Sequence, residues 1–206
     1  MAPIEWYQIA LPLVVCAAVA VVAVRVPRYR FALYGFLTIV GYAMLQDQIS
    51  ARVCPEYFTV LHPPIPGMTD PALLGISWGF IGGWWGGIVL GYVAGIVATL
   101  GPHPQLAPRE LVRPLLVLVS VLATVTALTG FTVWQHANLL GVSLDGGMNE
   151  LVPQERHRAV FVVACYHFTG YATATIGGVV LCGWVWAERR KRSRNGAAEC
   201  LTKASP

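Results

Sequence analysis

The sequence predicts an all-α protein, a polytopic membrane bundle of five transmembrane helices with the N-terminus outside and the C-terminus in the cytoplasm. Composition is the first observation behind this prediction. Only 12% of the 206 residues are charged and 56% are apolar, whereas soluble domains carry roughly 25% charged residues. The second observation is that five segments offer the ~20 mainly apolar residues that a membrane crossing needs.

The five expected spans follow one another along a single domain, residues 1–192. The second span is the least regular, because only its first fifteen residues are apolar. The polar residues after the fifth span show no apolar periodicity, so 193–206 are expected to be a disordered basic cytoplasmic tail. The spans are residues 6–26, 31–52, 71–100, 109–135 and 153–186.

Proline and acidic residues mark where the helices begin and end. Asp70 directly before Pro71 is typical of a helix N-cap followed by a first-turn proline. Pro55 disfavours helical geometry at Cys54, so the second helix is expected to end near Val53. Two outer loops of about seventeen residues remain, a length that often belongs to functional loops or ordered caps.

The distribution of charge predicts the orientation, since cytoplasmic loops carry an excess of Lys and Arg. With the N-terminus outside, 11 of the 14 Lys and Arg residues fall on the inner side. The outer side then holds three basic and seven acidic residues, and the inner side eleven basic and three acidic ones. The expected partner is therefore the lipid bilayer, with no nucleic acid.

A regular stripe of glycines runs along the third span. Six glycines at a spacing of four leave one smooth helix face, which lets another backbone approach closely. Gly170, Ala174 and Gly178 give the fifth span a similar face, so we expect these two helices to pack together in one subunit. A homo-oligomer or a membrane-protein partner bound through the third span is the alternative. The stripe is Gly75, Gly79, Gly83, Gly87, Gly91 and Gly95.

The candidate site lies on the outer side, where four of the five histidines and several acids share one membrane face. Loops 54–69 and 136–152 are expected to cover a polar pocket there. Asp47, Arg52, Glu56 and His62 would contribute from one side of the pocket, and His136, His157, His167 and Tyr171 from the other.

His167 and Asp47 are the candidates for chemistry. Ionisable groups inside spans are costly and tend to mark sites or relays, so His167 is a candidate acid, base or metal ligand. It could equally be a neutral histidine hydrogen-bonded to a neighbouring helix. Tyr171, one helical turn on, would orient it. Asp47 could accept a proton, but a structural ion pair with Arg52 is favoured, because an unpaired charge at that depth is expensive.

A metal centre is the weaker interpretation of the histidines. His136, His157 and His167 are the candidate ligands, and imidazole suits zinc or another transition metal such as copper or iron. No HxxxH or HExxH spacing is present. His157 and His167 also do not share a narrow helical face.

Several stretches resemble one family of small bacterial integral membrane proteins of unknown activity. They are DQISARVCPEYFTVLHPP, GISWGFIGGWWGGIVLG, PRELVRP and YHFTGYATATIGG. The resemblance spans residues 34–186 and implies a multi-pass protein of the bacterial cytoplasmic membrane with a polar cap on the outer side. It implies no catalytic residue.

Three functions are compatible with these residues. The first is binding of a small ligand or metal ion in the outer pocket. The second is a non-catalytic subunit or assembly factor that docks a partner through the glycine stripe. The third is transport, which the sequence favours least, because the inner halves of the spans carry almost no charged groups.

Overall fold

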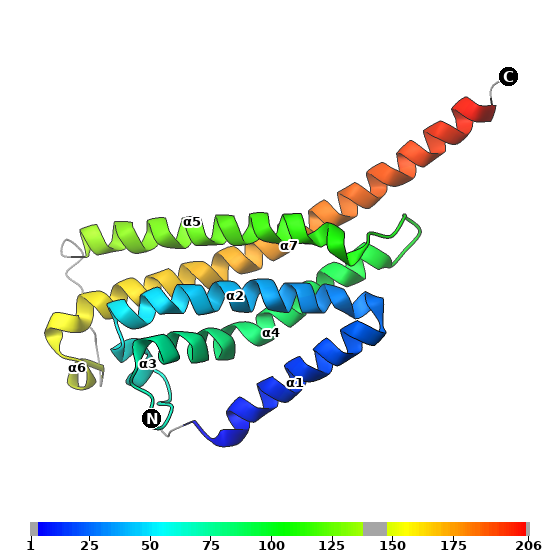
Figure 1. The fold of residues 1–206 in the computed structure, drawn as a ribbon. Helices are drawn as coiled ribbons and strands as arrows, with labels where there is room; N and C mark the ends of the chain where they lie inside the picture. Colours follow the sequence, from blue (N-terminus) through cyan, green and yellow to red (C-terminus); the bar gives the residue numbers. More distant parts are fainter. Residues whose placement is uncertain (1–3, 138–147, 205–206) are drawn as a thin grey trace.

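The computed structural model describes residues 4–137 and 148–204, and this part of the chain is helical apart from short turns and loops (Figure 1). The predicted all-α class is confirmed, with no strand among the described residues. The α-helices are α1 (Trp6–Arg25), α2 (Arg30–Val53), α3 (Glu56–Thr59), α4 (Pro71–Thr99), α5 (Val112–His136), α6 (Met148–Leu151) and α7 (His157–Ala204). Short 3-10 turns span Pro27–Tyr29, Pro108–Leu111 and Gln154–Arg156.

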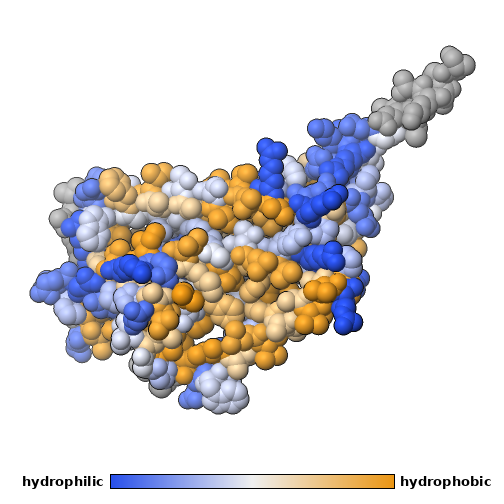
Figure 2. Space-filling view, viewed as in Figure 1, coloured by the Kyte–Doolittle hydropathy of each residue, from blue (hydrophilic) through white to orange (hydrophobic). Residues whose placement is uncertain are grey.

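Four helical segments are long and apolar enough to cross a membrane: Trp6–Arg25, Pro71–Thr99, Pro108–His136 and Gln154–Ala197. Helix α2 is not among them, because the polar run from Gln46 onward lowers its mean hydropathy. In Figure 2 an apolar band crosses the middle of the bundle, and hydrophilic residues gather at both ends. The chain is thus a bundle of long apolar helices, as a membrane protein requires.

The local signals for helix ends agree with the structure. Asp70 precedes α4 and its Oδ1 accepts hydrogen bonds from the backbone N–H groups of Ala72 and Leu73, both at 3.0 Å. These bonds satisfy two of the free donors of the first helical turn. Helix α2 ends at Val53, two residues before Pro55, as predicted.

Helix α7 differs from the expectation at its C-terminal end. It continues through Ala204, where the composition predicted a disordered tail from residue 193, and Figure 1 shows this part projecting beyond the bundle. Arg192 pairs with Glu188 one turn earlier (3.0 Å) and with Glu110 (2.6 Å). Such i, i+4 pairs and good helix formers favour continued helix even without a packing partner.

The glycine stripe of α4 packs against α2. An added Cβ at Gly79 would lie 2.5 Å from the Cα of Met44, and at Gly87 it would lie 2.8 Å from the Cα of Phe36. The contact is antiparallel, since Gly75 faces Asp47 at one end of α2 and Gly95 faces Phe31 at the other. All six stripe positions have α2 atoms as their nearest neighbours.

The expected pairing of the stripe with the fifth span is therefore wrong. Helix α7 meets α4 elsewhere, where Gly178 faces the side chain of Leu90 at 3.0 Å. Its other glycines face different helices: Gly170 lies opposite Gln46 and Thr126, and Gly177 opposite Leu118. The small residues of α7 thus make room for side chains of other helices. Only α2 lies against all six glycines of the α4 stripe.

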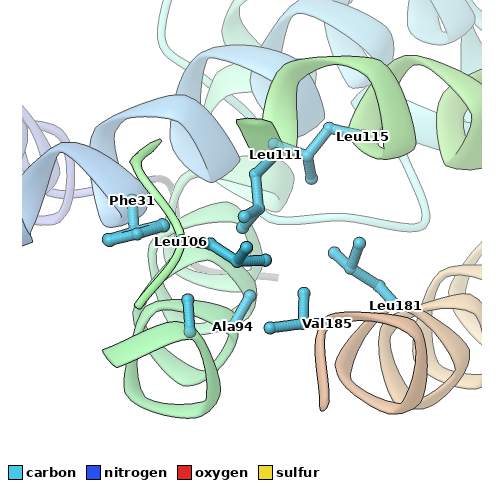
Figure 3. Packing of buried hydrophobic residues seen from close by; sticks show 8 residues of the cluster. Phe31, Ala94, Leu106, Leu111, Leu115, Leu181 and Val185 are labelled. Carbon is cyan, nitrogen blue, oxygen red and sulfur yellow. The ribbon is translucent and has the colours of Figure 1, made fainter. Parts of the chain in front are cut away.

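The end of the bundle opposite α3 closes around an apolar cluster that includes Phe31, Leu106, Leu111 and Leu181 (Figure 3). Buried Arg189 of α7 completes this end. Its guanidinium donates to the carbonyl oxygens of Leu100 (2.6 Å), His103 (2.7 Å) and Pro104 (2.9 Å), and to that of Val97. The bonds to Val97 and Leu100 satisfy carbonyls that the C-terminus of α4 leaves without helical partners, and the other two hold the loop that follows.

Replacing Gly87 with Ala should destabilise the protein by about 1–3 kcal/mol, because the new methyl group would overlap the backbone of α2. Gly86→Ala is the matched control: no atom lies within 4 Å of its Cβ position, and alanine favours helix over glycine by up to about 1 kcal/mol. The free energy of unfolding in mixed micelles measures both. Equal stability of the two variants would show that α2 and α4 are not in backbone contact.

Candidate functional site

Three buried polar side chains converge near the α3 end of the bundle. Asp47 and Ser50 lie three residues apart on one face of α2, and His167 faces them from α7. Their exposed fractions are 5%, 1% and 7%. His167 Nε2 lies 3.0 Å from Ser50 Oγ and 3.4 Å from Asp47 Oδ1. The structure thus brings two of the candidate residues, Asp47 and His167, into contact.

Helix packing places each member of this group. Gly75 of α4 lies against the backbone of Asp47, where a Cβ would be 2.9 Å from its carbonyl carbon and oxygen. Gln48 on the same turn donates from Nε2 to the carbonyl of Ala72 at 3.0 Å. The close approach of α2 and α4 therefore fixes the depth and rotation of Asp47.

An aromatic layer covers the group from the loop after α2. The Tyr57 ring stacks on His167 with centroids 4.9 Å apart and planes at 26°. His62 lies 4.7 Å from Tyr57 and 4.8 Å from Trp78 of α4, centroid to centroid. His62 Nδ1 lies 2.7 Å from the carbonyl oxygen of Tyr57. Loop 54–69 therefore forms a cap, as expected, and His62 is part of it.

The geometry at His167 excludes one familiar reaction scheme. In a Ser–His–Asp triad the serine and the aspartate contact different ring nitrogens, so that the histidine relays a proton between them. Here both Ser50 and Asp47 approach Nε2. Asp47 and Ser50 thus contact the same ring nitrogen, which is not the triad arrangement.

Two expected partners of this group differ from their predicted roles. Tyr171 makes only a tilted ring contact with His167, with centroids 6.4 Å apart, and 58% of the residue is exposed. The predicted ion pair of Asp47 with Arg52 is also absent. Arg52 Nη1 instead donates to the backbone oxygen and to Oε1 of Gln48, both at 2.7 Å. Its long side chain reaches toward the surface, while Asp47 points into the bundle.

Glu56 belongs to a separate clasp between α3 and the start of α7. Arg156 holds both carboxylate oxygens of Glu56 at 2.9 Å and also donates to the carbonyl of Val53 at 2.9 Å. Cys54 Sγ donates to Glu56 Oε2 at 3.3 Å. Burial is the largest of the causes that raise the pKa of this thiol to about 11. The clasp is structural, because it ties the end of α2 to α7.

The other two candidate histidines do not join His167. His136 is exposed at the end of α5, and its Nδ1 lies 2.9 Å from the carbonyl oxygen of Thr132 in the same helix. His157 is buried, with Nε2 2.9 Å from the carbonyl oxygen of Val152. Within residues 4–137 and 148–204 no three His, Cys, Asp or Glu side chains form a metal-binding group. The predicted His136–His157–His167 centre is therefore not assembled there.

A pocket of about 280 Å³ lies beside the polar group, between α2, α5 and α7. Ser50 and Tyr166 supply its polar wall, and its remaining lining is apolar apart from the indole of Trp134. The pocket therefore meets the buried polar group at Ser50. It is bounded by Ile49, Ser50, Val53, Ala127, Gly130, Phe131, Trp134, Val162, Val163 and Tyr166.

The second outer loop is described only in part. Of residues 136–152, those from 138 to 147 lie outside the described chain. Helix α6 and Val152 belong to the part that is described, and Val152 packs in an apolar cluster with Cys54, Val160 and Val163. This contact places the end of the loop against the clasp.

The clasp predicts a pH dependence of stability. Burial is the largest single influence on Glu56 and raises its pKa. The hydrogen bonds from Arg156, the backbone and Cys54, with the charge of Arg156, together outweigh burial and hold the pKa below its usual range. A carboxylate with a lowered folded pKa contributes stability that is present above the unfolded value of about 4.3 and lost as pH falls through the folded value. Thermal unfolding followed by circular dichroism should therefore show a stability loss below about pH 4.

Two variants isolate this contribution. Glu56→Gln should be less stable than wild type at neutral pH and should lack the part of the acid-dependent loss that Glu56 causes. Glu155→Gln, an exposed neighbour of Arg156, should keep the wild-type pH profile. If Glu56→Gln kept the wild-type dependence of stability on pH, the contact between Glu56 and Arg156 would not be its cause.

Comparisons with known proteins give no relative from which a function could be transferred: no protein-family model, no curated protein and no solved structure matches the chain.

Proposed function

We propose that the chain is a five-span protein of a bacterial cytoplasmic membrane, with the N-terminus in the periplasm and the C-terminus in the cytoplasm. Helix α2 lies against α4, α5 and α7 along the bundle, which supports its crossing with them. The two structural arginines of the α7 region, Arg156 and Arg189, are 33 residues apart, about 50 Å on a helix. This exceeds the ~30 Å hydrocarbon layer, which leaves room for one arginine at each membrane surface.

The function that the geometry supports best is binding of a small amphipathic molecule at the periplasmic half of the bundle. The apolar body of the ligand would occupy the pocket between α2, α5 and α7, and its hydroxyl group would donate to Ser50. One observation carries this proposal: Ser50 lines the pocket and its Oγ also lies 3.0 Å from His167 Nε2.

The residues behind Ser50 give the site its polarity. A serine hydroxyl can donate one hydrogen bond and accept two. Ser50 Oγ donates to the carbonyl oxygen of Gln46 at 3.4 Å and contacts His167 Nε2 at 3.0 Å, which leaves one acceptor position for the hydroxyl of a ligand. Nε2 of His167 is the atom that both Ser50 and Asp47 reach. It is therefore the atom that would take up or release a proton of a ligand bound at Ser50. Ionisable side chains within membrane spans are functional candidates for this reason.

Two alternatives have less support. A transition metal or zinc would need ligands that the described residues do not bring together. A non-catalytic subunit or assembly factor was expected to dock through the glycine stripe, but α2 occupies that face. A partner or a second copy would have to use another surface. Ser50, in contrast, already lines a pocket.

A photoreactive long-chain alcohol that carries a diazirine on its chain tests this function. In wild type, labelling should concentrate on the peptides that contain Phe131 and Val162, which line the pocket. Ala127→Phe, in the pocket wall, should block it, whereas Ala123→Phe, exposed one turn away and outside the lining, should not. Peptide mapping by mass spectrometry quantifies the label.

The polar anchor needs a separate comparison. Ser50→Ala should reduce labelling by the alcohol about five-fold, as expected for one lost hydrogen bond of about 1 kcal/mol, and should leave labelling by the matching hydrocarbon unchanged. Even labelling over all apolar helix faces, or equal labelling of the Ala127→Phe and Ala123→Phe variants, would contradict the proposed function.

A further inference from the structure

A second groove runs along the membrane-facing side of α5 and α7, away from the Ser50 pocket. It has a volume of about 620 Å³. Its floor contains the buried side chains of Leu118 and Leu181, and exposed Val117, Ile176 and Val180 line it closer to the surface. Gly177 belongs to the groove too, and a side chain there would collide with Leu118. Gly177 therefore lets Leu118 pack directly on α7 at the floor of this apolar valley.

The dimensions of the valley suit one hydrocarbon chain. Its lining runs from Arg113 to Val121 on α5 and from Thr173 to Trp184 on α7. At 1.5 Å per residue these stretches are about 12 and 16 Å long. The exposed rims are aliphatic, and Trp184 lies at one end, as is common where a span meets the headgroup layer.

One cation stands at that same end. Arg113 is the second residue of α5. It is exposed and lines the groove. The nearby acids are already paired, since Arg192 holds Glu110 at 2.6 Å and Glu188 at 3.0 Å. Among the described residues no hydrogen bond or ion pair reaches the Arg113 guanidinium. Its charge is therefore available to an external anion.

We propose that this groove is a binding site for an anionic phospholipid, with one acyl chain in the valley between α5 and α7 and the headgroup phosphate on Arg113. The charge at one end and the apolar length behind it match the two parts of such a lipid. Arginine suits phosphate because its planar guanidinium can donate two parallel hydrogen bonds. The site is independent of the ligand proposed at Ser50, which lies in a different pocket.

Native mass spectrometry of the full-length protein in detergent tests the site. The probe is an equimolar mixture of phosphatidylglycerol and phosphatidylcholine with identical acyl chains. Wild type should retain phosphatidylglycerol preferentially. Arg113→Gln should reduce the ratio of the two bound lipids about five-fold, since one basic residue near a membrane surface contributes about 1 kcal/mol to binding of anionic lipid. Arg25→Gln, an exposed arginine at the end of α1, should keep the wild-type ratio.

The acyl chain has its own pair of variants. Val180→Trp narrows the groove and should reduce binding of both lipids, whereas Val179→Trp, exposed but outside the lining, should not. Equal lipid ratios in Arg113→Gln and wild type would overturn the headgroup contact. Equal binding by the two tryptophan variants, or displacement of the lipid by inorganic phosphate alone, would overturn the acyl-chain contact. A wild-type dimer that Val180→Trp dissociates would instead assign the groove to a second copy of the chain.

Discussion

The backbone contact between α2 and α4 is the constraint on which the rest of the molecule depends. Six glycines at a spacing of four remove every side chain from one face of α4, and α2 fills that face over its length. In a membrane, where lipid competes equally for apolar surface, such close packing supplies much of the attraction between helices. The contact leaves α2 with no freedom to slide or rotate, because a shift would drive its backbone into α4.

This constraint positions the polar group. The stripe begins at Gly75, opposite Asp47, so the least apolar part of α2 is held where α7 can present His167. Two arginines then secure α7. Arg156, just before its first residue, binds Glu56 and the end of α2, and Arg189 binds carbonyls at and after the end of α4. In each contact a charged guanidinium donates to a backbone carbonyl oxygen at the C-terminal end of a helix. The Ser50 pocket and the groove between α5 and α7 lie on the flanks of this framework, along α5.

Sequence patterns predicted what each helix contributes but not which helices meet. The stripe of α4 was visible as a period of four, yet α2 as its partner was not, because α2 carries only Gly35 in that contact and packs mainly through backbone. Asp47 and His167 stood out as ionisable groups in apolar segments. Ser50 did not, although its position three residues after Asp47 on the same helical face was a usable signal. Arg52 is closer to Glu56 in sequence than Arg156 is, but only tertiary packing brings Arg156 to it.

The distance between Asp47 and His167 tests this account most directly. Solid-state NMR in lipid bilayers can measure dipolar dephasing between ¹³C-labelled aspartate carboxyl groups and ¹⁵N-labelled histidine rings, with Asp47→Asn to assign the signal. Strong dephasing is expected in wild type and in Gly82→Ala, where the nearest atom to an added Cβ is 3.8 Å away. It should weaken in Gly79→Ala, which forces α2 from α4. A wild-type protein without this coupling, or a Gly79→Ala variant that retains it in full, would contradict the account.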